Sequence, residues 1–297
     1  MKIGLIGLGK MGLNIASNLV RNNVEVIGYD IEKENLQIAT EQGVINGSSI
    51  EELILNLPTP RIIWLMLPAG DITHQMIIKM SQLLSANDIV IDGGNSFYKD
   101  SIKHYEIMKE KQILFYDVGT SGGISGALNG GNFMIGGDED NFYKIEDIFK
   151  KIAQDQGYLF TGKSGSGHYL KMVHNGIEYG MMQAIGEGFD LLEHSPYTYE
   201  NKKVANLWNH GSVVRSWLME LAIDAFDEDP KLEKIKGIMY SSGEGKWTVQ
   251  EALEREVAIP VISASLMMRY RSLENDTFTG KVVASLRKGF GGHKVAK

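Results

Sequence analysis

The sequence Gly7-Leu8-Gly9-Lys10-Met11-Gly12 decides the fold of the first half of the chain. An apolar run that starts at Ile3 precedes it, and apolar residues at helical spacing follow it, so the pattern predicts a strand over residues 2–6, a tight turn and a helix. Gly7 permits the turn, Gly9 lets the backbone approach a pyrophosphate, and Gly12 lets the helix pack on the strand. We therefore predict that all six residues bind a dinucleotide; the alternative is a plain glycine turn.

Asp30 predicts which dinucleotide binds. It ends the second predicted strand, eighteen residues beyond Gly12, where a carboxylate accepts hydrogen bonds from the adenosine ribose and repels a 2′-phosphate. Ile31 and Glu32 supply no arginine to hold such a phosphate, and Lys33 is the nearby cation. We expect NAD to be preferred over NADP, the alternative being a solvated turn aspartate. Three further candidates for the cofactor site, at the end of another predicted strand, are Leu67, Pro68 and Ala69.

Short β-rich runs alternate with helical patterns up to about residue 162, which predicts an α/β fold with a mostly parallel, doubly wound sheet. The predicted strands cover residues 2–6, 24–29, 61–67, 88–91, 113–118, 133–135 and 158–160. Beyond a glycine-rich link, helices are predicted over residues 169–193 and near 203–224, 247–257 and 259–274, with connections at 193–201 and 224–229. We expect a Rossmann-type domain at 1–164 and an all-helical substrate and oligomerisation domain with a C-terminal tail at 165–297.

Composition excludes several classes of protein. The 297 residues carry 30 basic and 37 acidic side chains, a net charge of -7, which argues against a nucleic-acid partner. The chain has no cysteine, so it has no disulfide or thiolate metal site, and we expect no metal. No apolar run approaches the roughly 20 residues that span a bilayer, and no export signal is visible. These features predict a cytoplasmic globular protein without a membrane partner.

The long predicted helix carries the candidate chemistry. Lys171, Asn175 and Glu178 are spaced i, i+4 and i+7, so a base, an amide and an acid project from one face. A solvated ion-pair stripe is the alternative, and it is the commoner meaning of this spacing. Gly176 and Gly180 argue against it, because glycines inside a helix suggest the close approach of another segment or a ligand.

Two small turns are candidates for holding substrate oxygens, although both could be ordinary tight turns. They are Asp92-Gly93-Gly94-Asn95-Ser96 and Gly119-Thr120-Ser121-Gly122-Gly123, each after a predicted strand.

The motifs taken together resemble those of 6-phosphogluconate dehydrogenase over nearly the whole chain. The strings that occur in order are GLGKMG, DGGNSFY, TSGG, GHYLKMVHNGIEYG and GKWT. The helix string is the specific one, because the wider β-hydroxyacid dehydrogenase group shares the glycine loop and lysine but usually lacks the His-Asn-Gly-Ile-Glu-Tyr continuation.

The resemblance, which is to short bacterial members, implies oxidation of 6-phosphogluconate at C3, loss of CO2 and formation of ribulose 5-phosphate, a reaction of the pentose phosphate pathway. It also implies that Lys171 is the general base and Glu178 the acid that protonates the enediol, with Asn175 beside them. The substrate-binding positions that it implies are Asn95, Ser121, Gly122, Gly123, His174 and Asn175, with Tyr179, Arg269 and Arg287 as phosphate anchors.

The sequence departs from the family pattern in two places. Ser242 stands where the family commonly has a lysine that reaches the substrate phosphate, and a large part of the long-form helical domain is absent.

Two other functions remain alternatives to the one that the resemblance implies. They are a β-hydroxyacid dehydrogenase acting on a small unphosphorylated acid and a non-catalytic NAD-binding protein.

The basic tail predicts how subunits cooperate. In the family, the tail of one subunit enters the active site of its neighbour, so we expect a homo-oligomer, a dimer or tetramer, in which Arg287 and His293 complete the neighbouring substrate site. A basic, fraying terminus is the alternative.

Overall fold

The computed structural model describes residues 1–291 and 294–296 and divides the chain into two compact units, Met1–His174 and Asn175–Lys297. The strands of the first unit are β1 (Lys2–Ile6), β2 (Glu25–Tyr29), β3 (Ile45–Asn46), β4 (Ile62–Leu65), β5 (Ile89–Asp92), β6 (Leu114–Ser121), β7 (Gly131–Gly136) and β8 (Ala153–Gly162). Its helices are α1 (Lys10–Arg21), α2 (Lys33–Glu41), α3 (Ile50–Leu55), α4 (Asp71–Leu83), α5 (Tyr98–Glu110), α6 (Gly123–Asn129), the 3₁₀ turn η1 (Glu139–Asn141) and α7 (Tyr143–Ile152).

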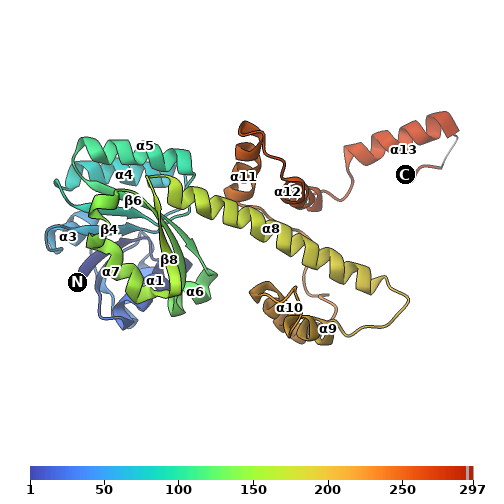
Figure 1. Ribbon diagram of the computed structural model, residues 1–297, viewed down its shortest axis with the longest axis horizontal. Coiled ribbons are helices and arrows are strands. Elements are labelled where there is room, and N and C mark those ends of the chain that lie inside the picture. The colour runs from blue at the N-terminus through green and yellow to red at the C-terminus, as the bar shows by residue number, and fades with distance from the viewer. Residues whose placement is uncertain (292–293, 297) are drawn as a thin grey trace. The chain divides into compact units, whose positions relative to one another are not determined.

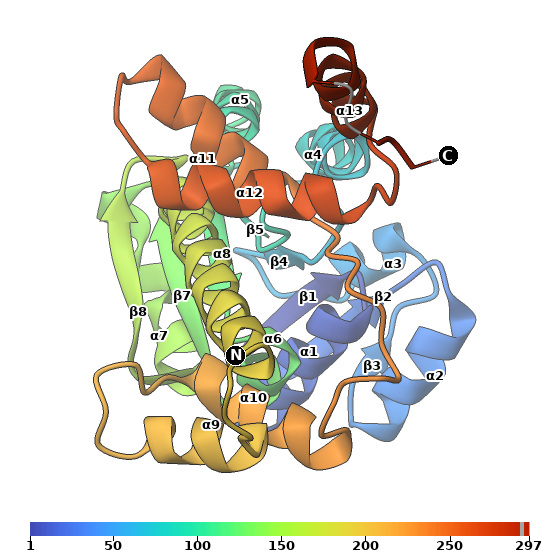
Figure 2. The ribbon, with the colours of Figure 1, turned by 90° about the vertical axis from the view of Figure 1, so that its right-hand side faces the viewer.

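The eight strands form one sheet in the order β3-β2-β1-β4-β5-β6-β7-β8 (Figures 1 and 2). Every neighbouring pair is parallel except β6 and β7. Strand order reverses at β1, which pairs with β2 on one side and β4 on the other. Such a switch point leaves a crevice at the carboxyl ends of the strands, where ligands of open α/β sheets bind.

Apolar layers cover both faces of the sheet, which confirms the predicted doubly wound α/β fold. Ile3 and Leu5 of β1 pack with Leu19 of α1 and Phe149 of α7, whereas Ile6 packs with Met80 of α4 in a second cluster. The alternation along β1 follows from the two-residue period of a strand, and burial on both faces explains its continuous apolar run. The sheet therefore fixes the carboxyl ends of β1, β2 and β4 firmly in register.

The second unit is helical. Helix α8 (Ser166–Glu193) begins in the first unit and continues into the second, where it is followed by α9 (Asn201–Asn209), α10 (Trp217–Glu228), α11 (Gly243–Glu254), α12 (Pro260–Ser272) and α13 (Phe278–Gly291). A small core joins α8, α9 and α10 through Phe189, Ala205, Met219 and Phe226. No helix within the described ranges is long and apolar enough to cross a membrane.

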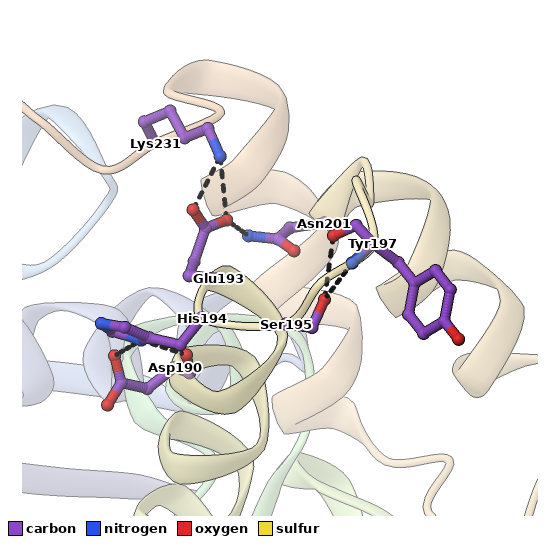
Figure 3. Close-up of polar contacts among 7 residues, drawn as sticks. All are labelled: Asp190, Glu193, His194, Ser195, Tyr197, Asn201 and Lys231. Carbon is purple, nitrogen blue, oxygen red and sulfur yellow. Dashed lines mark hydrogen bonds and ion pairs between the residues drawn. The ribbon is translucent and has the colours of Figure 1, made fainter.

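A polar cluster at the end of α8 connects this helix to the segments that follow it (Figure 3). Glu193 accepts hydrogen bonds from Lys231 Nζ at 2.7 Å and from Asn201 Nδ2 at 2.7 Å. The interaction with Lys231 is the largest cause of a lowered pKa at the Glu193 carboxyl. Glu193 thereby ties the last residue of α8 to the first residue of α9 and to the chain beyond α10.

Two sequence predictions were wrong in this unit. The segment near 203–224 is two helices, because Gly211 adopts a left-handed φ of 76° and the Ser216 side chain caps a new helix by accepting from Met219 N. The acidic stretch 224–229, predicted as a connection, continues α10 to Glu228. Asp224, Asp227 and Glu228 are exposed while Phe226 is buried, so these acids form the polar face of an amphipathic helix.

Candidate active site

A cavity of about 560 Å³ lies at the carboxyl edge of the sheet in the first unit. Its wall includes the glycine turn, the ends of β2 and β4, the start of α4, and residues after β5 and in β6. Among the lining residues are Gly7, Gly9, Lys10, Met11, Gly12, Asp30, Glu32, Met66, Leu67, Pro68, Ile72, Met76, Gly93, Gly94, Asn95 and Thr120. Most of the predicted cofactor positions therefore line one cavity.

The glycine turn fits a bound pyrophosphate. Gly7 has a left-handed φ of 95°, and a Cβ there would overlap the Met66 carbonyl oxygen. A Cβ on Gly12 would overlap the Gly7 carbonyl oxygen, so both positions require glycine. A Cβ on Gly9 would meet nothing within 4 Å, and Gly9 is the N-cap of α1. The open space at Gly9 and the amides of the helix end suit an anion.

Asp30 is held at the end of β2 by two backbone amides. Its Oδ2 accepts from Leu8 N at 2.6 Å, and its Oδ1 accepts from Glu32 N at 2.8 Å. The carboxylate oxygens keep further lone pairs for ribose hydroxyls. Glu32, which follows Asp30 by two residues, also lines the cavity, and Ile31 between them is 82% exposed.

Two predicted cofactor residues do not line the cavity. The Leu8 side chain is fully buried in the core. Its backbone amide is connected to the cavity wall only through the hydrogen bond that it donates to Asp30. Ala69 is exposed and also lies outside the cavity lining.

Three consecutive residues of β6 each contact a different candidate element within the first unit. A Cβ on Gly119 would overlap the Lys171 Cβ, so helix α8 approaches the strand here as closely as the backbone permits. Thr120 lines the cavity. Ser121 Oγ lies 3.3 Å from His174 Nε2. The end of β6 thus brings the cavity, Lys171 and His174 together.

Asn95 fixes this strand end from the neighbouring loop. It has a left-handed φ of 52°, which asparagine tolerates better than most residues. Its Oδ1 accepts from Thr120 N at 3.0 Å, and its Nδ2 donates to Thr120 O at 3.3 Å. After β5 ends at Asp92, the Asn95 amide therefore continues the pairing with β6.

Asp117 positions the start of α8. This fully buried carboxylate accepts from Gly165 N at 2.6 Å and from His168 N at 2.9 Å, so it satisfies amides at the helix N-terminus. His168 is further fixed by Ser101, whose Oγ lies 2.7 Å from His168 Nδ1. One turn later, Lys171 is only 5% exposed. The position of Lys171 therefore depends on Asp117.

The second unit contains a separate cluster around Tyr179, which is 5% exposed. The Arg269 guanidinium lies 3.6 Å from the ring centroid, and a Cβ on Gly245 in the first turn of α11 would overlap the ring. The Tyr179 hydroxyl accepts from Ser242 N at 3.0 Å and lies 3.1 Å from Ser242 Oγ. Two of the three predicted phosphate anchors, Tyr179 and Arg269, are thus in contact, and Ser242 touches the first of them.

The remaining predicted residues are placed as follows. Asn175 and Glu178 are half-buried on α8. A Cβ on Gly176 would lie 2.8 Å from Thr248 Cγ2, and one on Gly180 would lie 3.2 Å from Val261 Cγ1. The two glycines therefore allow α11 and α12 to pack closely against α8. Gly122 and Gly123 have positive φ angles of 101° and 59° at the start of α6. Arg287 is exposed on α13, and His293 lies outside the described residues.

Sequence reasoning did not name Asp117, and it gave Thr120 and Glu32 no role of their own. Thr120 belongs to the candidate turn that begins at Gly119, and Glu32 follows Asp30 by two, so their place in or beside a motif was the available signal. Asp117 had no such signal, because its partners lie 48 and 51 residues away.

The two units correspond to two family models. Residues 2–164 match the NAD binding domain of 6-phosphogluconate dehydrogenase, and residues 167–288 match the 6-phosphogluconate dehydrogenase C-terminal domain. The chain belongs to the 6-phosphogluconate dehydrogenase family. It is therefore an oxidoreductase with an NAD(P)-binding domain, as the sequence predicted.

Two relatives within the family match this chain along nearly their whole length. A Bacillus subtilis protein named "Putative 6-phosphogluconate dehydrogenase YqeC" is 54% identical over 297 residues, covering 100% of both chains. The NAD(+)-dependent, decarboxylating 6-phosphogluconate dehydrogenase of Haloferax volcanii is 40% identical, covering 100% of this chain and 99% of that protein. The solved Plasmodium falciparum 6-phosphogluconate dehydrogenase superposes with a TM-score of 0.84 at 32% identity, covering 100% of this chain and 66% of that one.

Proposed function

We propose that this protein oxidises and decarboxylates 6-phospho-D-gluconate to D-ribulose 5-phosphate and CO2, with NAD as the oxidant. The burial of Lys171 against Gly119, at the same strand end that lines the dinucleotide cavity, is the observation that carries the proposal. Lys171 would thereby supply an amine at this end of the cavity. The 40% identity to a decarboxylating NAD(+)-dependent enzyme supports the reaction.

Lys171 would act first, as the base that takes the proton of the C3 hydroxyl. A lysine must be in its neutral form to take up this proton. The bound nicotinamide supplies the chemistry of accepting the two electrons and hydrogen that leave C3. Lys171, now protonated, then stabilises the developing negative charge on the C3 oxygen as the bond to the carboxyl carbon breaks and CO2 departs.

Glu178 would complete the reaction by donating a proton to carbon of the enediol. It stands seven residues after Lys171 on the unbroken helix α8, with Asn175 between them, so the three side chains project from one helical face. Asn175 would hold a substrate oxygen between the base and the acid. Asn95, Ser121, Gly122, Gly123 and His174 would hold the remaining oxygens of the sugar acid.

Tyr179 and Arg269 would bind the phosphate. The guanidinium stacked on the ring keeps N–H groups for a phosphate oxygen, and arginine matches phosphate geometry by donating two parallel hydrogen bonds. The contact of the neutral Ser242 with Tyr179 favours a second candidate, a β-hydroxyacid dehydrogenase for a small unphosphorylated acid, because no cation occupies that position.

The preference for NAD rests on Asp30 and Glu32. Two carboxylates at the ribose end of the cavity would repel a 2′-phosphate, and Ile31 offers it no cation. We also propose that the protein is a cytoplasmic homo-oligomer, with Arg287 and His293 serving the site of a neighbouring subunit.

One assay separates the two substrates. The purified protein is supplied with NAD and either 6-phosphogluconate or gluconate, and NADH and released CO2 are measured together. We expect equimolar NADH and CO2 from 6-phosphogluconate, with kcat/KM at least about a hundredfold above gluconate, because the phosphate contacts are charge-assisted. Comparable use of both acids, or NADH without CO2, would refute the proposal and favour the unphosphorylated substrate.

A further inference from the structure

Thr120 carries a hydroxyl that makes no hydrogen bond within the part of the chain that the structure describes. The residue is 3% exposed, its Oγ1 is buried, and Oγ1 has no hydrogen bond among the described residues. The backbone of Thr120 is already bonded, because Asn95 accepts from its N–H and donates to its C=O. A buried hydroxyl without a partner costs free energy, so such a group requires an explanation.

Thr120 also lies at a defined place in the dinucleotide cavity, of which it forms part of the wall. Asp30 ends β2, whereas Thr120 lies in β6, and the sheet order places β1, β4 and β5 between them. Four strand spacings of about 4.8 Å separate the two residues by roughly 19 Å. With the adenosine ribose at Asp30 and the pyrophosphate at the glycine turn over β1, Thr120 therefore lies at the nicotinamide end.

The surroundings of Thr120 agree with this placement. The preceding residue, Gly119, is packed against the candidate base Lys171, so this end of the cavity is the reactive end. The nearby lining residues Met66, Gly93 and Gly94 have no side-chain hydrogen-bonding group beyond a thioether. Among these lining residues, Thr120 and Asn95 therefore carry the side-chain hydrogen-bonding groups.

We propose that the Thr120 hydroxyl hydrogen-bonds the carboxamide of the nicotinamide ring and so fixes which face of the ring meets the substrate. The carboxamide presents both a carbonyl acceptor and N–H donors, and a hydroxyl can pair with either. Rotation about χ1 exchanges the hydroxyl and methyl positions of a threonine between staggered wells, which brings Oγ1 to the cavity when the ring enters. The inference rests on the cofactor of the proposed function but not on the identity of the sugar acid.

The test uses the full-length protein with Thr120→Val, which removes the hydroxyl at nearly constant shape, and Thr120→Ser, which keeps it. NADH binding is measured by fluorescence without substrate, and ADP-ribose, which lacks the nicotinamide, is measured as its competitor. We expect Thr120→Val to raise the Kd of NADH about fivefold, the size of one net hydrogen bond. The Kd of ADP-ribose should stay within twofold, and Thr120→Ser should bind NADH like the wild type.

Thermal unfolding of the ligand-free variants is the second readout. Loss of an unsatisfied hydroxyl should leave the Tm of Thr120→Val equal to or above that of the wild type. An unchanged Kd of NADH in Thr120→Val would overturn the proposal, as would equal weakening of ADP-ribose or a lowered Tm. Failure of the protein to oxidise 6-phosphogluconate would refute the proposed substrate while leaving these binding measurements intact.

Discussion

Gly119 approaches Lys171 so closely that a methyl group on residue 119 would overlap the Lys171 Cβ. The strand end and the helix that carries the candidate base therefore fit together only when residue 119 is glycine. Gly119→Ala should displace Lys171 and lower kcat about a hundredfold, because small misplacements of a catalytic group have effects of that size.

The matched control is Gly188→Ala on α8, where an added Cβ meets nothing within 4 Å. It should retain full activity, and both variants should bind NADH with similar Kd values if the cofactor cavity is intact. Wild-type turnover in Gly119→Ala would show that the contact does not position the base.

Lys171→Met and Glu178→Ala should separate two steps of the reaction. The lysine variant should lose hydride transfer by about 10³-fold or more in a single-turnover measurement of NADH, because the base acts first. The glutamate variant should keep that step and lose incorporation of a solvent proton into the product. Glu187→Ala on the same helix serves as the control. Normal turnover in Lys171→Met would refute the base, and unchanged deuterium incorporation by Glu178→Ala would refute the acid.

Asp30→Asn combined with Ile31→Arg should shift cofactor preference from NAD towards NADP. The change removes a carboxylate that repels the 2′-phosphate and places an arginine at a position that is 82% exposed beside the cavity. The ratio of kcat/KM for the two cofactors measures the shift. Equal or better use of NADP by the wild type would contradict the role given to Asp30.

The tail can be tested by complementation between subunits. Lys171→Met subunits and Arg287→Ala/His293→Ala subunits should each be inactive, whereas hybrids formed by co-refolding should regain activity, since one site then combines an intact helix with an intact tail. Lys171→Met co-refolded with Lys171→Met/Arg287→Ala serves as the control and should stay inactive. Full activity in a monomer that lacks the tail would end this proposal.

His104 should make the first unit less stable in acid. Burial, the largest cause, lowers its pKa below the ordinary 6.5, and neighbouring His74 and His168 act in the same direction against Asp92 and Asp100. The folded protein holds His104 neutral while the unfolded chain takes up a proton. The free energy of unfolding should thus be highest above pH 6.5 and fall as the pH drops from 6.5 towards the lowered pKa.

Urea unfolding between pH 5 and 8 measures this dependence. His104→Gln should flatten it, whereas His210→Gln, at an exposed position, should not. An unchanged slope in His104→Gln would assign the acid sensitivity to other groups.

The sheet could be predicted because its strands contain short apolar runs between turn residues, such as the runs that start at Ile3 and Ile89. Strand β3 was not predicted, since its two residues, Ile45 and Asn46, are both exposed. Helix α13 was read as a basic tail, although Phe278, Val282 and Leu286 recur at helical spacing. The division at 164/165 stays a prediction, because α8 begins at Ser166 while the compact units meet at His174.

The candidate site was predictable where residue types and spacing carry the chemistry, as for the glycine turn and Lys171. Contacts between distant segments were not predictable from one sequence. The buried Asp117 carboxylate at the start of α8 and the contact of Ser242 with Tyr179 depend on how the chain folds back, and no local pattern encodes them.

The two hydrogen bonds between the Asn95 amide and the Thr120 backbone limit the donors and acceptors that Asn95 keeps for a ligand. An asparagine amide has two N–H donors and two acceptor lone pairs, and the strand end uses one of each. One N–H and one lone pair remain. Asn95→Asp would lose both donors at once, opening the end of β6 as well as weakening any ligand contact. Activity lost at residue 95 would therefore reflect a weakened strand end as well as a weakened ligand contact.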